Sequence, residues 1–138
     1  MQCFTRGETK GNALRPILVR LRIYHYLCIK QPTSNAMSYS KLYYHIVFRT
    51  YQSQRTINEA HERDLYAYIL AYCRAHDICL LRINSMPDHI HMFVSLRPDV
   101  CLADFVRELK KSAGNFIKSH PREFPMFNGW GIGYCAIS

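Results

Sequence analysis

The 138-residue sequence has no apolar run long enough to cross a membrane. The segment 17–29 is apolar in character, but Arg20, Arg22 and His25 interrupt it, and a membrane-spanning helix needs about 20 apolar residues. This segment also lies far from the start and precedes no small-residue cleavage pattern, so a signal peptide is not expected. Internal repeats, low-complexity tracts and glycine-rich phosphate-binding loops are missing too. We expect one folded domain with no membrane partner.

The six cysteines include no Cys-x-x-Cys pair. Without such a pair or a secretory leader, we expect reduced thiols in a cytoplasmic protein and assign the cysteines no chemistry.

The formal net charge of +8 suggests an anionic partner, but the charge is unevenly distributed. Residues 1–36 hold six basic and one acidic side chain, whereas residues 37–138 hold 12 basic and nine acidic ones. We expect Met37 to be the natural start. Residues 1–36 are then upstream codons read in frame, with a genuine basic arm as the alternative. The domain at 37–138 is only mildly basic, which allows nucleic-acid binding without requiring it.

The spacing of apolar residues predicts the order β-α-β-β-α-β. Alternation of apolar and polar side chains predicts strands at 42–49, 79–85, 89–96 and 134–137. Apolar residues at helical spacing predict a helix from an Asn58 N-cap to about Asp77, and a second helix capped by Asp99. This order is typical of the α+β, ferredoxin-like fold, an antiparallel sheet with two helices on one face and the other face free for a ligand.

The segment His89-Ile90-His91 places two imidazoles two residues apart on a predicted strand. Strand side chains alternate between faces, so both histidines share one face while Ile90 and Met92 mark the buried one. Two such imidazoles can chelate one divalent metal and leave positions open for water or phosphate oxygens. The alternative is a pair of partly exposed histidines that bind nothing, because short motifs often mislead.

Basic residues of the second predicted helix lie largely away from its apolar stripe. A solvated helix face and contact with DNA phosphates are both compatible with this pattern. The candidate DNA contacts are Arg49, Arg107, Lys110, Lys111 and Lys118.

Four segments in order resemble the single-tyrosine transposases of the IS 200/605 insertion-sequence group, within the HUH superfamily of single-stranded DNA nicking enzymes. The resemblance spans most of 37–138, and Met86-Pro87-Asp88-His89-Ile90-His91 is similar to the metal-binding signature of the family. The other three similar segments are Tyr44–Thr50, Phe105–Lys110 and Trp130–Ala136.

The resemblance implies a transposase that binds hairpins at the ends of a mobile element in single-stranded form, nicks them and rejoins the strands. His89 and His91 match the pair that holds Mg²⁺ or Mn²⁺, which polarises the scissile phosphate. A tyrosine is the implied nucleophile and keeps a 5′-phosphotyrosine link. The resemblance also implies a homodimer.

The sequence departs from the family pattern at its C-terminal end. The family places its tyrosine on a helix beyond the last strand, and this chain stops at Ser138. Tyr66, Tyr68, Tyr72 and Tyr134 are not convincing substitutes, so we expect this chain alone to be inactive in forming the covalent intermediate. One alternative is a truncated remnant that only binds DNA. Another is a metal-dependent phosphoesterase that uses a water nucleophile.

Overall fold

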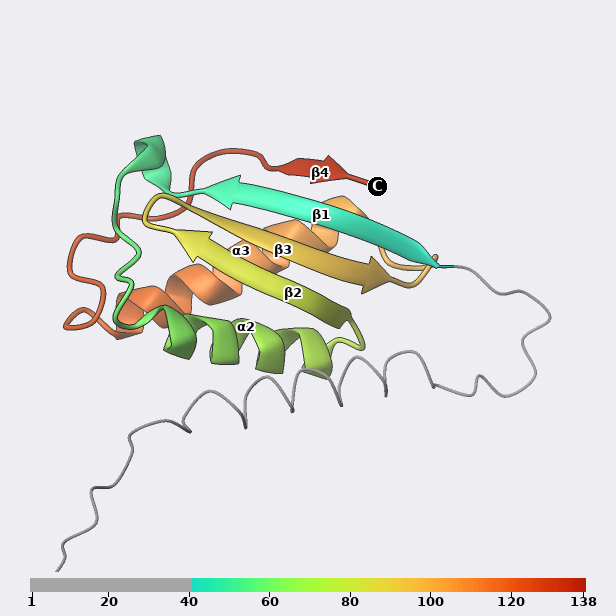
Figure 1. Ribbon diagram of the computed structural model, residues 1–138, viewed down its shortest axis with the longest axis horizontal. Helices are drawn as coiled ribbons and strands as arrows, with labels where there is room; N and C mark the ends of the chain where they lie inside the picture. Colours follow the sequence, from blue (N-terminus) through green and yellow to red (C-terminus); the bar gives the residue numbers. More distant parts are fainter. Residues whose placement is uncertain (1–40) are drawn as a thin grey trace, which may run out of the picture. The chain divides into compact units, whose positions relative to one another are not determined.

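The computed structural model describes residues 41–138, which form a four-stranded sheet and two long helices (Figure 1). The predicted extension at 1–36 and the predicted start at Met37 lie outside these residues. The elements are β1 (Leu42–Arg49), the short 3₁₀ helix η1 (Tyr51–Ser53), α2 (Glu62–Ala75), β2 (Cys79–Met86), β3 (His89–Leu96), α3 (Leu102–Ser119) and β4 (Cys135–Ile137).

The sheet has the strand order β2-β3-β1-β4, and each neighbouring pair of strands is antiparallel. With one helix between β1 and β2 and another between β3 and β4, this order confirms the predicted ferredoxin-like α+β fold. The fold places β1 and β3 side by side at the centre of the sheet. In the sequence, 39 residues that include α2 and β2 separate the end of β1 from the start of β3.

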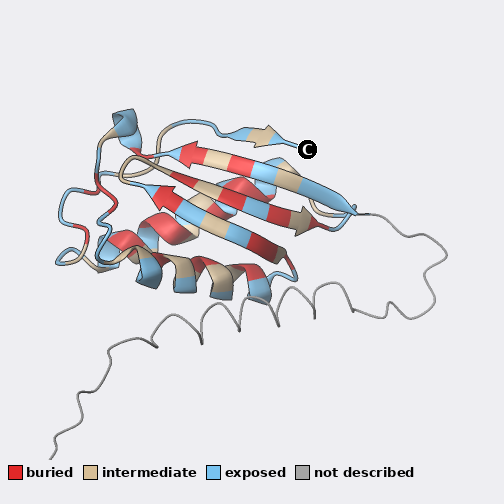
Figure 2. Ribbon diagram, in the orientation of Figure 1, coloured by how far each residue is buried: buried red, intermediate tan, exposed pale blue. Residues whose placement is uncertain are grey.

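The hydrophobic core lies between the sheet and the two helices (Figure 2). Alternate residues of β1 and β3, among them Ile46, Phe48, Ile90 and Met92, are almost fully buried against the helices. The helices contribute their predicted apolar stripes, of which the buried members are Leu65, Ile69, Phe105, Val106, Leu109, Ala113 and Ile117. The other side of the sheet, which we call the open face, carries the predicted histidine pair.

Both helices begin a few residues later than predicted. The Asn58 side chain accepts a hydrogen bond from the Ala60 amide in a turn that precedes α2, and the helix begins at Glu62 with His61 as its N-cap residue. Asp99 pairs with Arg97 rather than capping α3, which begins at Leu102. The predictions of Asn58 and Asp99 as N-caps are therefore wrong.

Three of the cysteines, Cys73, Cys101 and Cys135, are free thiols, as expected. Burial raises the pKa of the Cys73 thiol to about 12, which makes it unreactive. Among the helices in residues 41–138, none has the length and apolar character to cross a membrane.

Candidate metal centre on the open face of the sheet

Hydrogen bonds from the loop between β1 and α2 hold the turn before His89 in place. The Thr50 amide donates to the Asp88 carbonyl over 2.9 Å, and the amides of Thr56 and Ile57 both donate to the Pro87 carbonyl over 2.9 Å. Thr50 is only 1% exposed, and its hydroxyl is also within 3.1 Å of the Asp88 carbonyl. Because the loop grips the backbone of residues 87 and 88, the start of β3 has a fixed position.

His89 is oriented by the residue before it. Its Nδ1 donates a hydrogen bond to Asp88 Oδ1 over 2.7 Å. This hydrogen bond is the main reason why the pKa of the Asp88 carboxyl lies below its usual range, with a smaller contribution from the Arg49 charge. With the proton on Nδ1, the Nε2 lone pair of His89 is free to bind a metal, and a carboxylate partner of this kind is common behind metal-binding histidines.

His91 has a histidine partner that sequence reasoning did not select. His45 Nε2 on β1 lies 3.1 Å from His91 Nδ1, and the two rings stack with centroids 5.3 Å apart. If His91 donates its Nδ1 proton to His45, the Nε2 lone pair of His91 is also free for a metal. Burial, followed by the nearby His89 and His45, lowers the pKa of His91, which favours the neutral imidazole that metals bind.

The open face therefore offers two imidazole nitrogens, from His89 and His91, whose rings lie 4.8 Å apart between centroids. Within residues 41–138, no group of three or more histidine, cysteine, aspartate or glutamate side chains is arranged to hold one ion. Two nitrogen donors with oriented rings fit Mg²⁺ or Mn²⁺ only as part of a coordination sphere, so oxygen ligands from water, phosphate or residues outside the described range must complete it.

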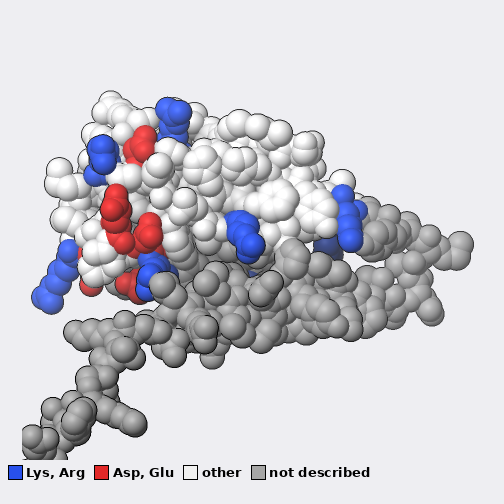
Figure 3. Space-filling view, in the orientation of Figure 1, with Lys and Arg blue, Asp and Glu red and all other residues white. Residues whose placement is uncertain are grey.

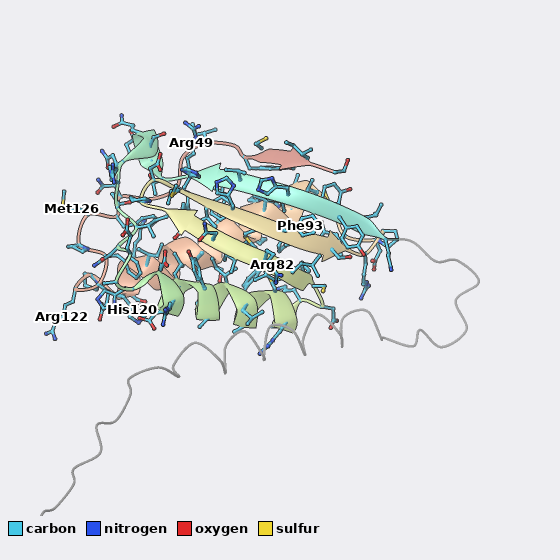
Figure 4. All side chains as sticks on the ribbon, viewed as in Figure 1. Arg49, Arg82, Phe93, His120, Arg122 and Met126 are labelled. Atoms are coloured by element: carbon cyan, nitrogen blue, oxygen red, sulfur yellow. The ribbon has the colours of Figure 1, made fainter. Side chains whose placement is uncertain are left out.

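The strands around this pair carry no negative charge. None of the residues in β1, β2, β3 and β4 is aspartate or glutamate, and Asp88 lies in the turn before β3. Arg49 stands opposite His89 in the register of β1 and β3, at the end of the sheet that also holds the turn. The open face is therefore suited to an anionic ligand, with Arg49 at its edge as a candidate phosphate contact (Figure 4).

The other predicted DNA contacts belong to α3, in the helical layer on the opposite side of the sheet. Arg107 pairs with Asp104 over 2.8 Å and with Glu108 over 3.3 Å, so two carboxylates balance its charge. Lys111 and Lys118 are exposed. The structure thus separates these residues from the histidine pair, and a DNA contact by Lys111 or Lys118 stays a prediction.

Lys110 has a structural role that its place on the helix surface did not indicate. Its ammonium group donates hydrogen bonds to the carbonyls of Gly131 and Gly133, over 2.7 and 2.8 Å. Partial burial lowers the pKa of this lysine. Lys110 thereby ties the segment before β4 to α3 and is not free to contact DNA while it does so.

We expect Lys110→Met to lower the free energy of unfolding by about 1–3 kcal/mol, because both carbonyls lose a charged donor. Lys111→Met is the matched control, since Lys111 is exposed on the same helix and should change stability by less than about 0.5 kcal/mol. Urea denaturation followed by circular dichroism measures both. Equal effects of the two substitutions would contradict the structural role of Lys110.

Two tyrosines of α2, Tyr66 and Tyr68, use their hydroxyls in contacts within the domain. The Tyr66 hydroxyl lies within hydrogen-bond distance of Ser85 and Glu62, and the Tyr68 hydroxyl lies 2.7 Å from that of Ser112. Burial is the main cause that raises the pKa of Tyr66 and of Tyr72. A raised pKa disfavours the phenolate form of Tyr66 and Tyr72, and that the tyrosines of α2 are not substitutes for the nucleophile stays a prediction.

The fold and the site together define the class of protein: a ferredoxin-like α+β domain with an oriented His-x-His pair on its open face. Residues 38–138 match the family model described as "Transposase IS200 like". The chain belongs to the IS200-like transposase family. This membership confirms the resemblance seen in the sequence and supports a role in DNA transposition.

A solved structure shares the fold. It is the crystal structure of a candidate transposase from Deinococcus radiodurans R1, which is 21% identical in sequence and superposes with a TM-score of 0.68. The match covers 77% of this chain and 85% of that one. A comparison with curated proteins gave no match.

Proposed function

We propose that the domain binds hairpin ends of an insertion sequence in single-stranded form and presents the scissile phosphate to the histidine pair for metal-dependent nicking and strand transfer. The observation that carries this proposal is the arrangement of His89 and His91. Each has its Nδ1 engaged, by Asp88 or His45, so that Nε2 can serve as a ligand.

The residues of the site would act in distinct ways on a bound DNA strand. Arg49 would hold a phosphate at the edge of the sheet, and Asp88 and His45 would keep the two imidazole rings in their orientations. A divalent cation held by His89 and His91 would supply charge stabilisation for the phosphodiester oxygens. The nucleophile implied by the family resemblance is a tyrosine, and we expect it to come from outside residues 41–138. A homodimer is part of the same proposal.

DNA binding without cleavage is the second candidate function. Two observations on residues 41–138 favour it: no set of three metal-ligating side chains converges there, and burial raises the pKa of Tyr66 and of Tyr72. A metal-dependent phosphoesterase with a water nucleophile is the remaining alternative, and multiple turnover without a protein–DNA adduct would support it.

The test is to mix the purified chain with labelled hairpin DNA and Mn²⁺ and to analyse the mixture on native and denaturing gels. We expect a shift of the single-stranded hairpin on the native gel, stronger than for a duplex of the same stem sequence, and no covalent adduct on the denaturing gel. A covalent adduct would show that a tyrosine of this chain is the nucleophile and would exclude the binding-only function. Failure to bind the hairpin would overturn the proposal.

A further inference from the structure

Two aromatic rings lie exposed on the open face, beside the histidines but outside the candidate metal centre. Phe93 on β3 and Tyr43 on β1 stack with ring centroids 5.8 Å apart and an angle of 20° between their planes. Phe93 is 38% exposed and Tyr43 is 36% exposed. Neither ring is needed to fill the core, which lies on the other side of the sheet. Together they form an aromatic platform on the open face, where Met86 and Ile137 are also exposed.

The register of the strands gives this platform its neighbours. Phe93 stands opposite His45 on β1 and opposite Arg82 on β2. It also follows His91 by two residues on the same face of β3, a step of about 7 Å along a strand. The platform therefore lies one row of the sheet away from His91, and an arginine marks its outer side (Figure 4).

Arg82 is exposed and has no carboxylate partner among the described ion pairs of residues 41–138. Its guanidinium makes one weak contact, 3.4 Å to the carbonyl of Leu81. Figure 4 places Arg82 on β2 beside Phe93 on β3, and Figure 3 shows few charged side chains over the middle of the sheet. A cation beside stacked aromatic rings, on strands without acidic residues, is complementary to a nucleotide, which has a flat ring and a negative phosphate.

We propose that Phe93, Tyr43 and Arg82 form a subsite for one unpaired nucleotide of single-stranded DNA, with its base on the aromatic rings and its phosphate at Arg82. Base pairs inside a duplex are stacked on one another and cannot place a ring face on the platform, so the subsite selects an unstacked base. The identity of the occupant rests on the proposed function, because the neighbouring histidine pair is what points to DNA. The subsite adds a means of placing the nucleotide next to the scissile phosphate.

The first test is fluorescence anisotropy with a labelled hairpin that carries a single-stranded extension, in EDTA so that no metal contributes. Phe93→Ala should weaken binding about 5- to 150-fold, the range for losing one stacked base. Phe93→Leu should weaken it similarly, whereas Phe93→Tyr should keep affinity within about threefold. Met126→Ala is the matched control, because Met126 is 68% exposed on a loop away from the sheet and should leave binding unchanged (Figure 4).

A second measurement locates the nucleotide on the DNA. Unpaired positions of the extension are replaced one at a time by an abasic residue. One position should weaken binding by the native chain and have no further effect on Phe93→Ala, because base and ring belong to the same contact. Arg82→Gln should reduce the slope of log affinity against log salt by about 0.7, the value for one phosphate contact on a single strand.

The outcomes separate this proposal from the proposed function. A native chain that binds the hairpin as tightly as Phe93→Ala would overturn the subsite and leave the proposed function standing. Native affinity in Phe93→Leu with loss in Phe93→Ala would also overturn it, since a general apolar contact would then suffice. A native chain that does not bind the hairpin would overturn both.

Discussion

His91→Ala is expected to weaken Mn²⁺ binding to the domain by at least about 100-fold, because it removes one of two nitrogen ligands and the partner of His45 together. Mn²⁺ titration followed by electron paramagnetic resonance measures the free ion directly and does not depend on cleavage. His89→Ala should have a comparable effect. Mn²⁺ binding that is unchanged in both variants would remove the metal from the proposed function.

His45→Ala separates the ligands from the residue that orients one of them. The Nε2 of His91 stays in place in this variant, but its ring loses the contact at Nδ1, so Mn²⁺ affinity should fall by about 10- to 100-fold and remain measurable. His76→Ala is the control, because His76 lies at the C-terminal end of α2, where it contacts Tyr72. A loss as large as that of His91→Ala would indicate that His45 is itself a ligand.

The position of the histidine pair could be predicted from sequence because strand periodicity is local. Alternation over 89–96 places His89 and His91 on the face opposite Ile90 and Met92, and the structure shows this arrangement. The partner of His91 could not be predicted in the same way. Alternation over 42–49 puts His45 on the exposed side of its strand, but only the register of β1 against β3 brings it to His91. Register depends on contacts between distant segments, which one sequence does not reveal.

The roles of surface residues were the least predictable part. A lysine on the polar side of a helix pattern has the same signature whether it contacts solvent, DNA or a neighbouring loop, and Lys110 contacts the carbonyls of Gly131 and Gly133. The predicted helix starts were wrong for a related reason, since Asn58 forms a turn before α2 and Asp99 pairs with Arg97, so neither side chain caps its helix. The strand order, by contrast, followed from the number and sequence of the elements.

Phe48→Ala is expected to have the largest effect on stability, about 3–5 kcal/mol, since it removes an aromatic ring that is 1% exposed. The ring meets Trp130 edge to face at 4.9 Å between centroids, and Trp130 meets Phe127 in turn at 5.0 Å. The substitution would leave a cavity on the core side of β1, beside Ile90, which pairs with Phe48 across the strands. The next pair of residues in the register is Arg49 and His89. Urea denaturation followed by circular dichroism measures the loss.

Phe93→Ala is the matched control for this prediction, because it removes the same side chain from the opposite face of the sheet. Phe93 is 38% exposed, so its loss should change the free energy of unfolding by less than about 1 kcal/mol. The two substitutions should therefore affect different properties. Phe48→Ala lowers stability, whereas Phe93→Ala lowers affinity for single-stranded DNA in a domain that stays folded. Equal losses of stability would contradict the division of this sheet into a core face and an open, ligand-binding face.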